Sequence, residues 1–116
     1  SKLQRSFDVL RAKVNLQTQV NGSTPDNFNM PHIDPVHFQN KATNWIFLYY
    51  LVDADGDTFI FNETAAGGCP SRLTIRERVT PRANNGILFR DDIFHASSNP
   101  IHSRRRVNLN FNLIAG

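Results

Sequence analysis

The sequence predicts an all-β domain, and three observations carry that prediction. Short segments alternate apolar and polar residues with the period of a strand. Residues that favour turns separate these segments at short intervals. After the first dozen residues, no segment has the length and spacing of the helix that must connect two parallel strands. About eight short antiparallel strands in one small domain fit a jelly roll, also called a double-stranded β-helix, in which two Greek keys close into a flattened barrel.

A short N-terminal segment is the one place where a helix is expected. Leu3, Phe7 and Leu10 have helical spacing, which predicts an amphipathic helix over residues 3–12. The period then changes to two, because apolar and polar residues alternate over residues 14–20. That alternation predicts the first strand, with one apolar and one polar face.

The other strands are separated by segments rich in Gly, Pro, Asn and Asp. They are predicted over residues 31–34, 44–52, 57–62, 73–79, 87–89, 94–97 and 104–114. Residues 53–56, with the sequence Asp-Ala-Asp-Gly, predict a tight turn that would join the strands on either side into a hairpin. Residues 21–29 and 63–71 are expected to be loops.

Size and composition limit the classes of protein to consider. A chain of 116 residues is expected to form one domain, residues 1–116. With 40% hydrophobic and 20% charged residues it has the composition of a soluble globular protein, and no apolar run approaches the ~20 residues of a membrane span. The single cysteine, Cys69, allows no internal disulfide, and no signal-peptide pattern opens the chain, so a reducing, cytoplasmic location is expected. Cys69 itself is interpreted as an ordinary loop thiol.

A metal-ligand pattern supplies the candidate functional site. Side chains two apart on a strand share a face, so His32 and Asp34 can bind one metal ion while Ile33 turns toward the core. In a jelly roll the second and seventh strands are neighbours, which would bring His95 beside them. Two imidazoles and one carboxylate form the facial triad of non-haem Fe(II) oxygenases, which leaves positions open for a chelating co-substrate and dioxygen. The other histidines are expected to face solvent: His37 and His102.

A cluster of arginines near the C-terminus supplies a second functional group. Alternate residues from Val107 to Leu113 form an apolar face that is expected to pack against the N-terminal helix. The same alternation directs Arg106 and the asparagines that follow it into the barrel. An arginine fork binds both oxygens of a carboxylate, so Arg106 is the preferred carboxylate-binding residue. Arg104 has the same parity and is the reserve candidate, whereas Arg105 is expected to point outward.

With these features the chain resembles the 2-oxoglutarate- and Fe(II)-dependent oxygenases, most closely their prolyl-4-hydroxylase-like branch. The resemblance runs from about residue 14 to residue 114. The segments that carry it are Pro31-His32-Ile33-Asp34, Tyr49-Tyr50-Leu51, residues 56–61 (Gly-Asp-Thr-Phe-Ile-Phe), residues 86–89 (Gly-Ile-Leu-Phe), His95 and residues 106–111 (Arg-Val-Asn-Leu-Asn-Phe). Family members often have Gly-Gly before the fourth strand, where this chain has Asp55-Gly56, a pair that also makes a turn.

The resemblance implies cofactors and a role for each candidate residue. Fe(II), bound by His32, Asp34 and His95, would chelate the keto-acid end of 2-oxoglutarate, and dioxygen would take the remaining position. Arg106 and Tyr50, the second aromatic of the Tyr-Tyr-Leu segment, would hold the far carboxylate. The implied reaction hydroxylates a C–H bond and converts 2-oxoglutarate to succinate and carbon dioxide, with ascorbate as an optional reductant.

The resemblance also suggests the partners. The expected substrate is a peptidyl or free amino-acid side chain, in a channel walled by the loops at residues 21–30 and 63–71. No membrane partner is expected. The apolar backs of Trp45, Phe47 and Phe111 need cover, so the chain is expected to be either a trimmed domain or one that buries this face in a homodimer.

Three alternatives stay open from the sequence. A nucleic-acid-dealkylating oxygenase would share Arg106-Val107-Asn108-Leu109, but it should have an arginine in place of Asn112 and an Asn-x-Tyr element before the metal motif. The net charge of +3 favours a polyanionic partner only weakly. A non-catalytic jelly-roll module should lack part of the triad or the basic residue, and this chain has both. A cupin-like metal enzyme should combine more histidines with glutamate, which occurs here only at Glu63 and Glu77.

Overall fold

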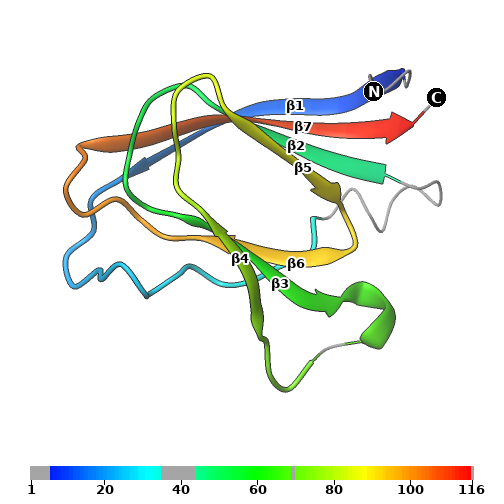
Figure 1. Cartoon of the computed structure of the whole chain (residues 1–116), viewed down its shortest axis with the longest axis horizontal. Helices are drawn as coiled ribbons and strands as arrows, with labels where there is room; N and C mark the ends of the chain where they lie inside the picture. The colour runs from blue at the N-terminus through cyan, green and yellow to red at the C-terminus, as the bar shows by residue number, and fades with distance from the viewer. Residues whose placement is uncertain (1–5, 35–43, 69, 116) are drawn as a thin grey trace.

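The structure is a computed structural model that describes residues 6–34, 44–68 and 70–115, and these residues form seven strands in two antiparallel sheets (Figure 1). The strands are β1 (Phe7–Thr18), β2 (Asn44–Tyr50), β3 (Thr58–Thr64), β4 (Ile75–Val79), β5 (Gly86–Arg90), β6 (Ile93–Ser97) and β7 (Arg105–Ala115). The larger sheet has the order β1-β7-β2-β5 and the smaller sheet has the order β4-β3-β6. A short 3-10 helix, η1 (Ala65–Gly67), follows β3. The predicted all-β class is therefore confirmed.

The predicted N-terminal helix is wrong, because the described part of that segment belongs to a strand. β1 begins at Phe7 and pairs with β7 along its whole length, from the pair Phe7↔Ala115 to the pair Thr18↔Arg105. A β-bulge lies between Val9 and Arg11, which makes Leu10 an extra residue on β1. The bulge interrupts the alternation of faces at the point where the sequence showed helical spacing, and pairing with β7 overrides the local pattern.

The predicted hairpin at residues 53–56 is also wrong. β2 pairs with β5 and β7, whereas β3 pairs with β4 and β6, so the chain crosses from one sheet to the other between β2 and β3. The predicted strand over residues 31–34 is reduced to a single antiparallel bridge between His32 and His95. This bridge places His32 at the free edge of β6.

Apolar side chains cover both faces of the smaller sheet. Between the sheets lies a cluster formed by Ile46, Leu48, Ile60 and Phe89. On the opposite face of the smaller sheet, Phe59 and Phe61 pack against Phe28 of the loop that follows β1, with ring centroids 5.0 and 5.3 Å apart. Successive residues of β3 thus contribute to different clusters, as the period of a strand requires.

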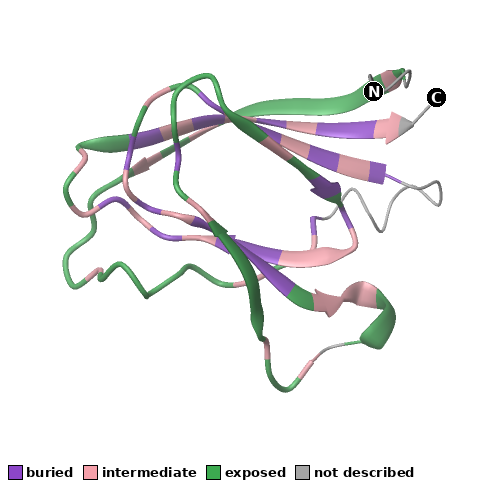
Figure 2. Cartoon of the chain, in the orientation of Figure 1, coloured by how far each residue is buried: buried purple, intermediate pink, exposed green. Residues whose placement is uncertain are grey.

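The outer face of the larger sheet is apolar and has no covering element among the described residues. Val107 and Leu109 of β7 lie on it beside Leu16 and Val14 of β1, rather than against the predicted helix. The side chains of Val14 and Leu16 are each 63% exposed, and Figure 2 shows that β1 is exposed along most of its length. No helix in the described part of the chain is long and apolar enough to cross a membrane.

Candidate active site

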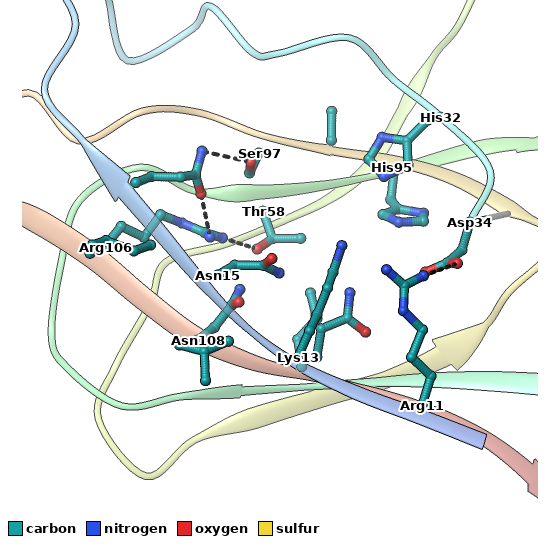
Figure 3. A pocket seen from close by; sticks show the side chains of 16 residues that line it. Arg11, Lys13, Asn15, His32, Asp34, Thr58, His95, Ser97, Arg106 and Asn108 are labelled. Carbon is teal, nitrogen blue, oxygen red and sulfur yellow. Dashed lines mark hydrogen bonds and ion pairs between the residues drawn. The ribbon is translucent and has the colours of Figure 1, made fainter. Parts of the chain in front are cut away.

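A cavity of about 580 Å³ lies between the two sheets and brings four of the sequence-predicted site residues together (Figure 3). His32, Asp34, His95 and Arg106 all line it. Its volume is in the range of pockets that bind whole small molecules. The two loops expected to wall a substrate channel contribute no side chain to it among their described residues, because β1 forms that wall instead.

The backbone holds the two histidines side by side. His32 and His95 exchange both backbone hydrogen bonds, with N···O distances of 3.0 and 3.1 Å, and their ring centroids are 4.5 Å apart. In each ring, Nδ1 lies beside a backbone carbonyl oxygen two residues earlier, at 3.1 Å for His32 and 2.9 Å for His95. A carbonyl oxygen only accepts, so Nδ1 carries the proton in both rings. In a neutral ring this arrangement leaves the lone pair on Nε2, which is the atom that a metal-binding histidine of this tautomer uses.

Burial keeps His95 neutral. It lowers the pKa of the His95 imidazole to about 4, and the hydrogen bond to the carbonyl of Ile93 and the charge of Asp34 offset this only in part. A neutral imidazole binds a metal ion without first releasing a proton.

The third predicted ligand, Asp34, is buried at the same end of the cavity. Its Oδ2 accepts a hydrogen bond from Nδ2 of Asn112 at 3.1 Å, and its Oδ1 lies 3.9 Å from Nη1 of Arg11. The donor chemistry of two imidazoles and a carboxylate fits Fe(II). As placed in the described structure, however, no three His, Cys, Asp or Glu side chains are close enough together to hold a metal ion.

Arg106 lies in the cavity wall some distance along β7 from this group. Its guanidinium is buried and donates three hydrogen bonds, from Nε to the carbonyl of Gly56 at 2.6 Å, from Nη1 to Gln17 at 2.8 Å and from Nη2 to Thr58 at 2.6 Å. A guanidinium has five N–H donors, so two of them are left over. Arg104 and Arg105 are exposed.

No carboxylate among the described residues forms an ion pair with Arg106. Burial lowers the pKa of the Arg106 guanidinium, although the group remains charged. The charge of Asp57 offsets the effect of burial only in part, and a buried cation without an ion pair is unfavourable, so this position of the cavity favours an anionic ligand.

Thr58 connects Arg106 to the predicted tyrosine. The hydroxyl groups of Tyr50 and Thr58 are 2.8 Å apart, and the Tyr50 ring lies 5.7 Å from Cζ of Arg106. Burial raises the pKa of Tyr50, which keeps its hydroxyl protonated. Thr58, rather than Tyr50, lines the cavity. Sequence reasoning missed Thr58, and the available signal was its shared parity with the inward-facing Ile60.

Sequence reasoning also missed most of the polar wall that β1 contributes. The inward side chains of this strand are Arg11, Lys13, Asn15 and Gln17, and all four line the cavity. They lie opposite residues of β7 that share the interior face: Asn112, Asn110, Asn108 and Arg106. The alternation over residues 14–20 indicated a polar face for Asn15 and Gln17, but the helix predicted over residues 3–12 hid Arg11.

The remaining sequence candidates lie away from the cavity or outside the described residues. His102 is exposed, and its backbone N–H donates to Asp55 at 3.0 Å. His37 and Cys69 fall outside the described residues. No protein-family model matches the chain, and no curated protein matches its sequence.

Proposed function

We propose that the protein is a 2-oxoglutarate- and Fe(II)-dependent oxygenase. One observation carries the proposal: a single cavity holds two histidines whose Nδ1 atoms face backbone carbonyls, a buried carboxylate and, at another position, a buried arginine that forms no ion pair with a described carboxylate. The first three groups are the ligand types of a facial triad. The arginine suits the far carboxylate of a dicarboxylate co-substrate.

The proposed fold is a jelly roll, and the order of the strands supports it. If the segment at His32 is counted as an eighth strand, in second position along the chain, the sheets have the orders 1-8-3-6 and 5-4-7-2. Two interleaved Greek keys produce this order. It accounts for the meeting of His32 and His95, which are 63 positions apart in the sequence (95 minus 32).

In this proposal each residue has a distinct role. His32, Asp34 and His95 would bind Fe(II), with the carbonyls of Met30 and Ile93 fixing the rings through Nδ1. When bound, iron and 2-oxoglutarate activate dioxygen to hydroxylate a C–H bond, with release of succinate and carbon dioxide.

The carboxylate end of the site belongs to Arg106. Its two remaining N–H groups would bind the far carboxylate of 2-oxoglutarate, while Thr58 and the carbonyl of Gly56 hold the guanidinium in place. Tyr50 would support this position through Thr58. The expected primary substrate is a peptidyl or free amino-acid side chain.

Succinate formation from 2-oxoglutarate tests the proposal. With Fe(II) and ascorbate, the wild-type protein should form succinate slowly even without a primary substrate. His95→Ala should abolish this turnover, and Arg106→Met should raise the KM for 2-oxoglutarate about 10- to 100-fold, the effect of losing hydrogen bonds to a charged group. Arg106→Lys, which keeps the charge, should retain part of the affinity.

Two matched variants serve as controls. Arg105→Met removes a neighbouring exposed cation from β7, and His102→Ala removes an exposed histidine. Both should leave turnover unchanged. A folded wild-type protein that forms no succinate, and whose melting temperature does not respond to Fe(II), would instead support a non-catalytic module.

A further inference from the structure

Lys13 is a second cationic group in the cavity, at a distance from Arg106. It extends from β1 into the cavity on the side of His95 and Asp34, while Arg106 lies on the other side (Figure 3). In the β1–β7 ladder, Lys13 pairs with Asn110 and Arg106 pairs with Gln17. Four residues of strand therefore separate the two positions, or about 13 Å. The two cations therefore enter the cavity from separate positions along the sheet.

The charges that line the cavity leave Lys13 without a described counter-ion. Three cationic side chains, Arg11, Lys13 and Arg106, line it against one carboxylate, Asp34. Arg11 is the cation that lies beside Asp34, at 3.9 Å. Fe(II) and the 2-oxoglutarate dianion would cancel each other's charge, so their binding would not neutralise Lys13.

The neighbouring strand supplies a second polar group beside Lys13. Asn110 is directly opposite Lys13, and directly opposite side chains on adjacent strands have Cβ atoms about 5 Å apart. Asn110 is 93% buried, lines the cavity, and its amide oxygen has no hydrogen-bond partner among the described residues. The amide can turn to present either its N–H₂ donors or its oxygen to a ligand. Lys13 and Asn110 can thus donate to the two oxygens of one anionic group.

The geometry favours a carboxylate over a phosphate. Phosphate sites commonly use a bidentate arginine or a row of backbone N–H groups at a helix N-terminus. Here Arg11 faces Asp34, and Arg106 is bonded to Gly56, Gln17 and Thr58. One ammonium and one amide match the two oxygens of a carboxylate.

We propose that the primary substrate carries a carboxylate, and that Lys13 binds it with Asn110 so that the rest of the molecule lies beside the metal site. This inference rests on the proposed oxygenase function and narrows its substrate class to carboxylate-bearing amino acids or short peptides. The carboxylate can be the α-carboxylate or that of an acidic side chain.

The test compares matched small probes that differ in their charge. The panel contains N-acetyl amino acids, their neutral N-acetyl amides, the N-acetyl amides of Asp and Glu, and the N-acetyl amide of phosphoserine. Binding to the protein in the presence of 2-oxoglutarate, which occupies the Arg106 position, is measured by saturation-transfer NMR. Stimulation of succinate formation is measured with Fe(II). We expect binding and stimulation by the N-acetyl amino acids, which carry an α-carboxylate, by the N-acetyl amides of Asp and Glu, which carry a side-chain carboxylate, or by both sets of probes. The set that responds shows which carboxylate the site binds.

Variants connect this preference to Lys13. Lys13→Met should weaken the binding of the best carboxylate probe about tenfold and raise its KM more than it lowers kcat, because a hydrogen bond to a charged group is lost. Lys13→Arg should restore part of the affinity. Arg105→Met removes an exposed cation from the adjacent strand and should have no effect.

Different results overturn different claims. Neutral amides that bind as well as the acids, a preference for the phosphoserine probe, or a Lys13→Met variant with unchanged probe affinity would each overturn the carboxylate inference. The carboxylate inference would also be overturned if Lys13→Met abolished succinate formation in the absence of any probe, since Lys13 would then act in the binding or turnover of 2-oxoglutarate. A wild-type protein that forms no succinate in any arm would overturn the oxygenase function and this inference with it.

Discussion

At the scale of residues, the buried group formed by Arg106, Thr58 and Tyr50 is the most specific feature of the site. Oγ1 of Thr58 lies 2.6 Å from Nη2 of Arg106 and 2.8 Å from the Tyr50 hydroxyl, so this one hydroxyl group forms a hydrogen bond with each of the two larger side chains. All three residues are at most 2% exposed. Buried polar groups that lose a partner are costly, so Thr58 supports both the fold and the orientation of Arg106.

Replacement of Thr58 by valine tests this role. Valine keeps the shape but leaves the Tyr50 hydroxyl and one Arg106 N–H without a partner, which should lower the free energy of unfolding by about 1–3 kcal/mol in urea titrations. The KM for 2-oxoglutarate should also rise. Thr18→Val, at an exposed position of β1, is the matched control. An unchanged stability in Thr58→Val would contradict the assigned role.

The sequence could predict some of these residues and not others. Strand parity predicts that Arg106, Asn108 and Asn110 share a face, because β7 is regular from end to end. Thr58 shares its parity with the inward-facing Ile60, but this signal was weak, since a polar residue just after a turn has many common roles. Lys13 was hidden for a different reason: a bulge at Leu10, three residues before it, breaks the alternation, so the start of its strand resembled a helix.

At the scale of elements, the crossing between β2 and β3 positions Arg106, because the carbonyl of Gly56 accepts a hydrogen bond from its Nε. Gly56 has a φ of 93°, and a Cβ there would lie 2.7 Å from the carbonyl oxygen of Ser98 and 3.2 Å from Cδ of Arg106. Glycine is needed both for the backbone conformation and for the close approach. The sequence indicated the turn but not that the chain crosses there to the other sheet, because strand pairing depends on contacts between residues far apart in the chain.

Gly56→Ala should therefore lower the stability of the protein by more than the strain of a positive φ alone would. Gly22 has a similar φ of 83° with nothing within 4 Å of a Cβ, which makes Gly22→Ala the matched control. The control should lose about 1–2 kcal/mol of stability, and Gly56→Ala should lose a further 1–3 kcal/mol or so from crowding. Gly56→Ala should also weaken 2-oxoglutarate binding, because Arg106 must move. Equal losses in the two variants would show that the close approach does not matter.

Asp55 fixes the segment that leads into β7. Its carboxylate accepts hydrogen bonds from the backbone N–H groups of Ile101, His102 and Ser103 at 2.7, 3.0 and 2.8 Å. Partial burial would raise the pKa of Asp55, but these bonds outweigh it and hold the pKa well below its usual range. Because the folded-state pKa is depressed, the stabilisation is present above the unfolded pKa of about 4 and is lost as the pH falls below it.

Asp55→Asn tests this dependence on pH. At pH 7 the variant should be less stable by about 1–2 kcal/mol, because a neutral amide is a weaker acceptor than a carboxylate. The difference from wild type should shrink as the pH is lowered from about 4, since the Asp55 carboxylate of the unfolded wild-type chain then becomes protonated while that of the folded protein stays ionised. Asp8→Asn, at an exposed position of β1, should show neither effect. A difference that stays constant from pH 7 to pH 2 in urea titrations would refute the assignment.

At the scale of the whole molecule, the two sheets pack at one side through Ile46, Leu48, Ile60 and Phe89 and leave a polar cavity beside this cluster. The all-β class and the bounds of most strands followed from alternation and turn residues. The true extent of β1 and the crossing at residues 53–56 did not, because both are decided by pairing with distant strands. The interior asparagines of β7 are unusual for a core, and two of them, Asn108 and Asn110, line the polar cavity.

Metal-dependent binding of 2-oxoglutarate tests the central claim most directly. The measurement is an anaerobic titration of folded wild-type protein with 2-oxoglutarate, with and without Fe(II), followed by the same titration of His95→Ala and Arg106→Met. We predict one molecule bound per chain only when Fe(II) is present, with the metal dependence lost in His95→Ala and the affinity reduced in Arg106→Met. The absence of binding to folded wild-type protein with Fe(II), or unchanged binding in both variants, would contradict the claim.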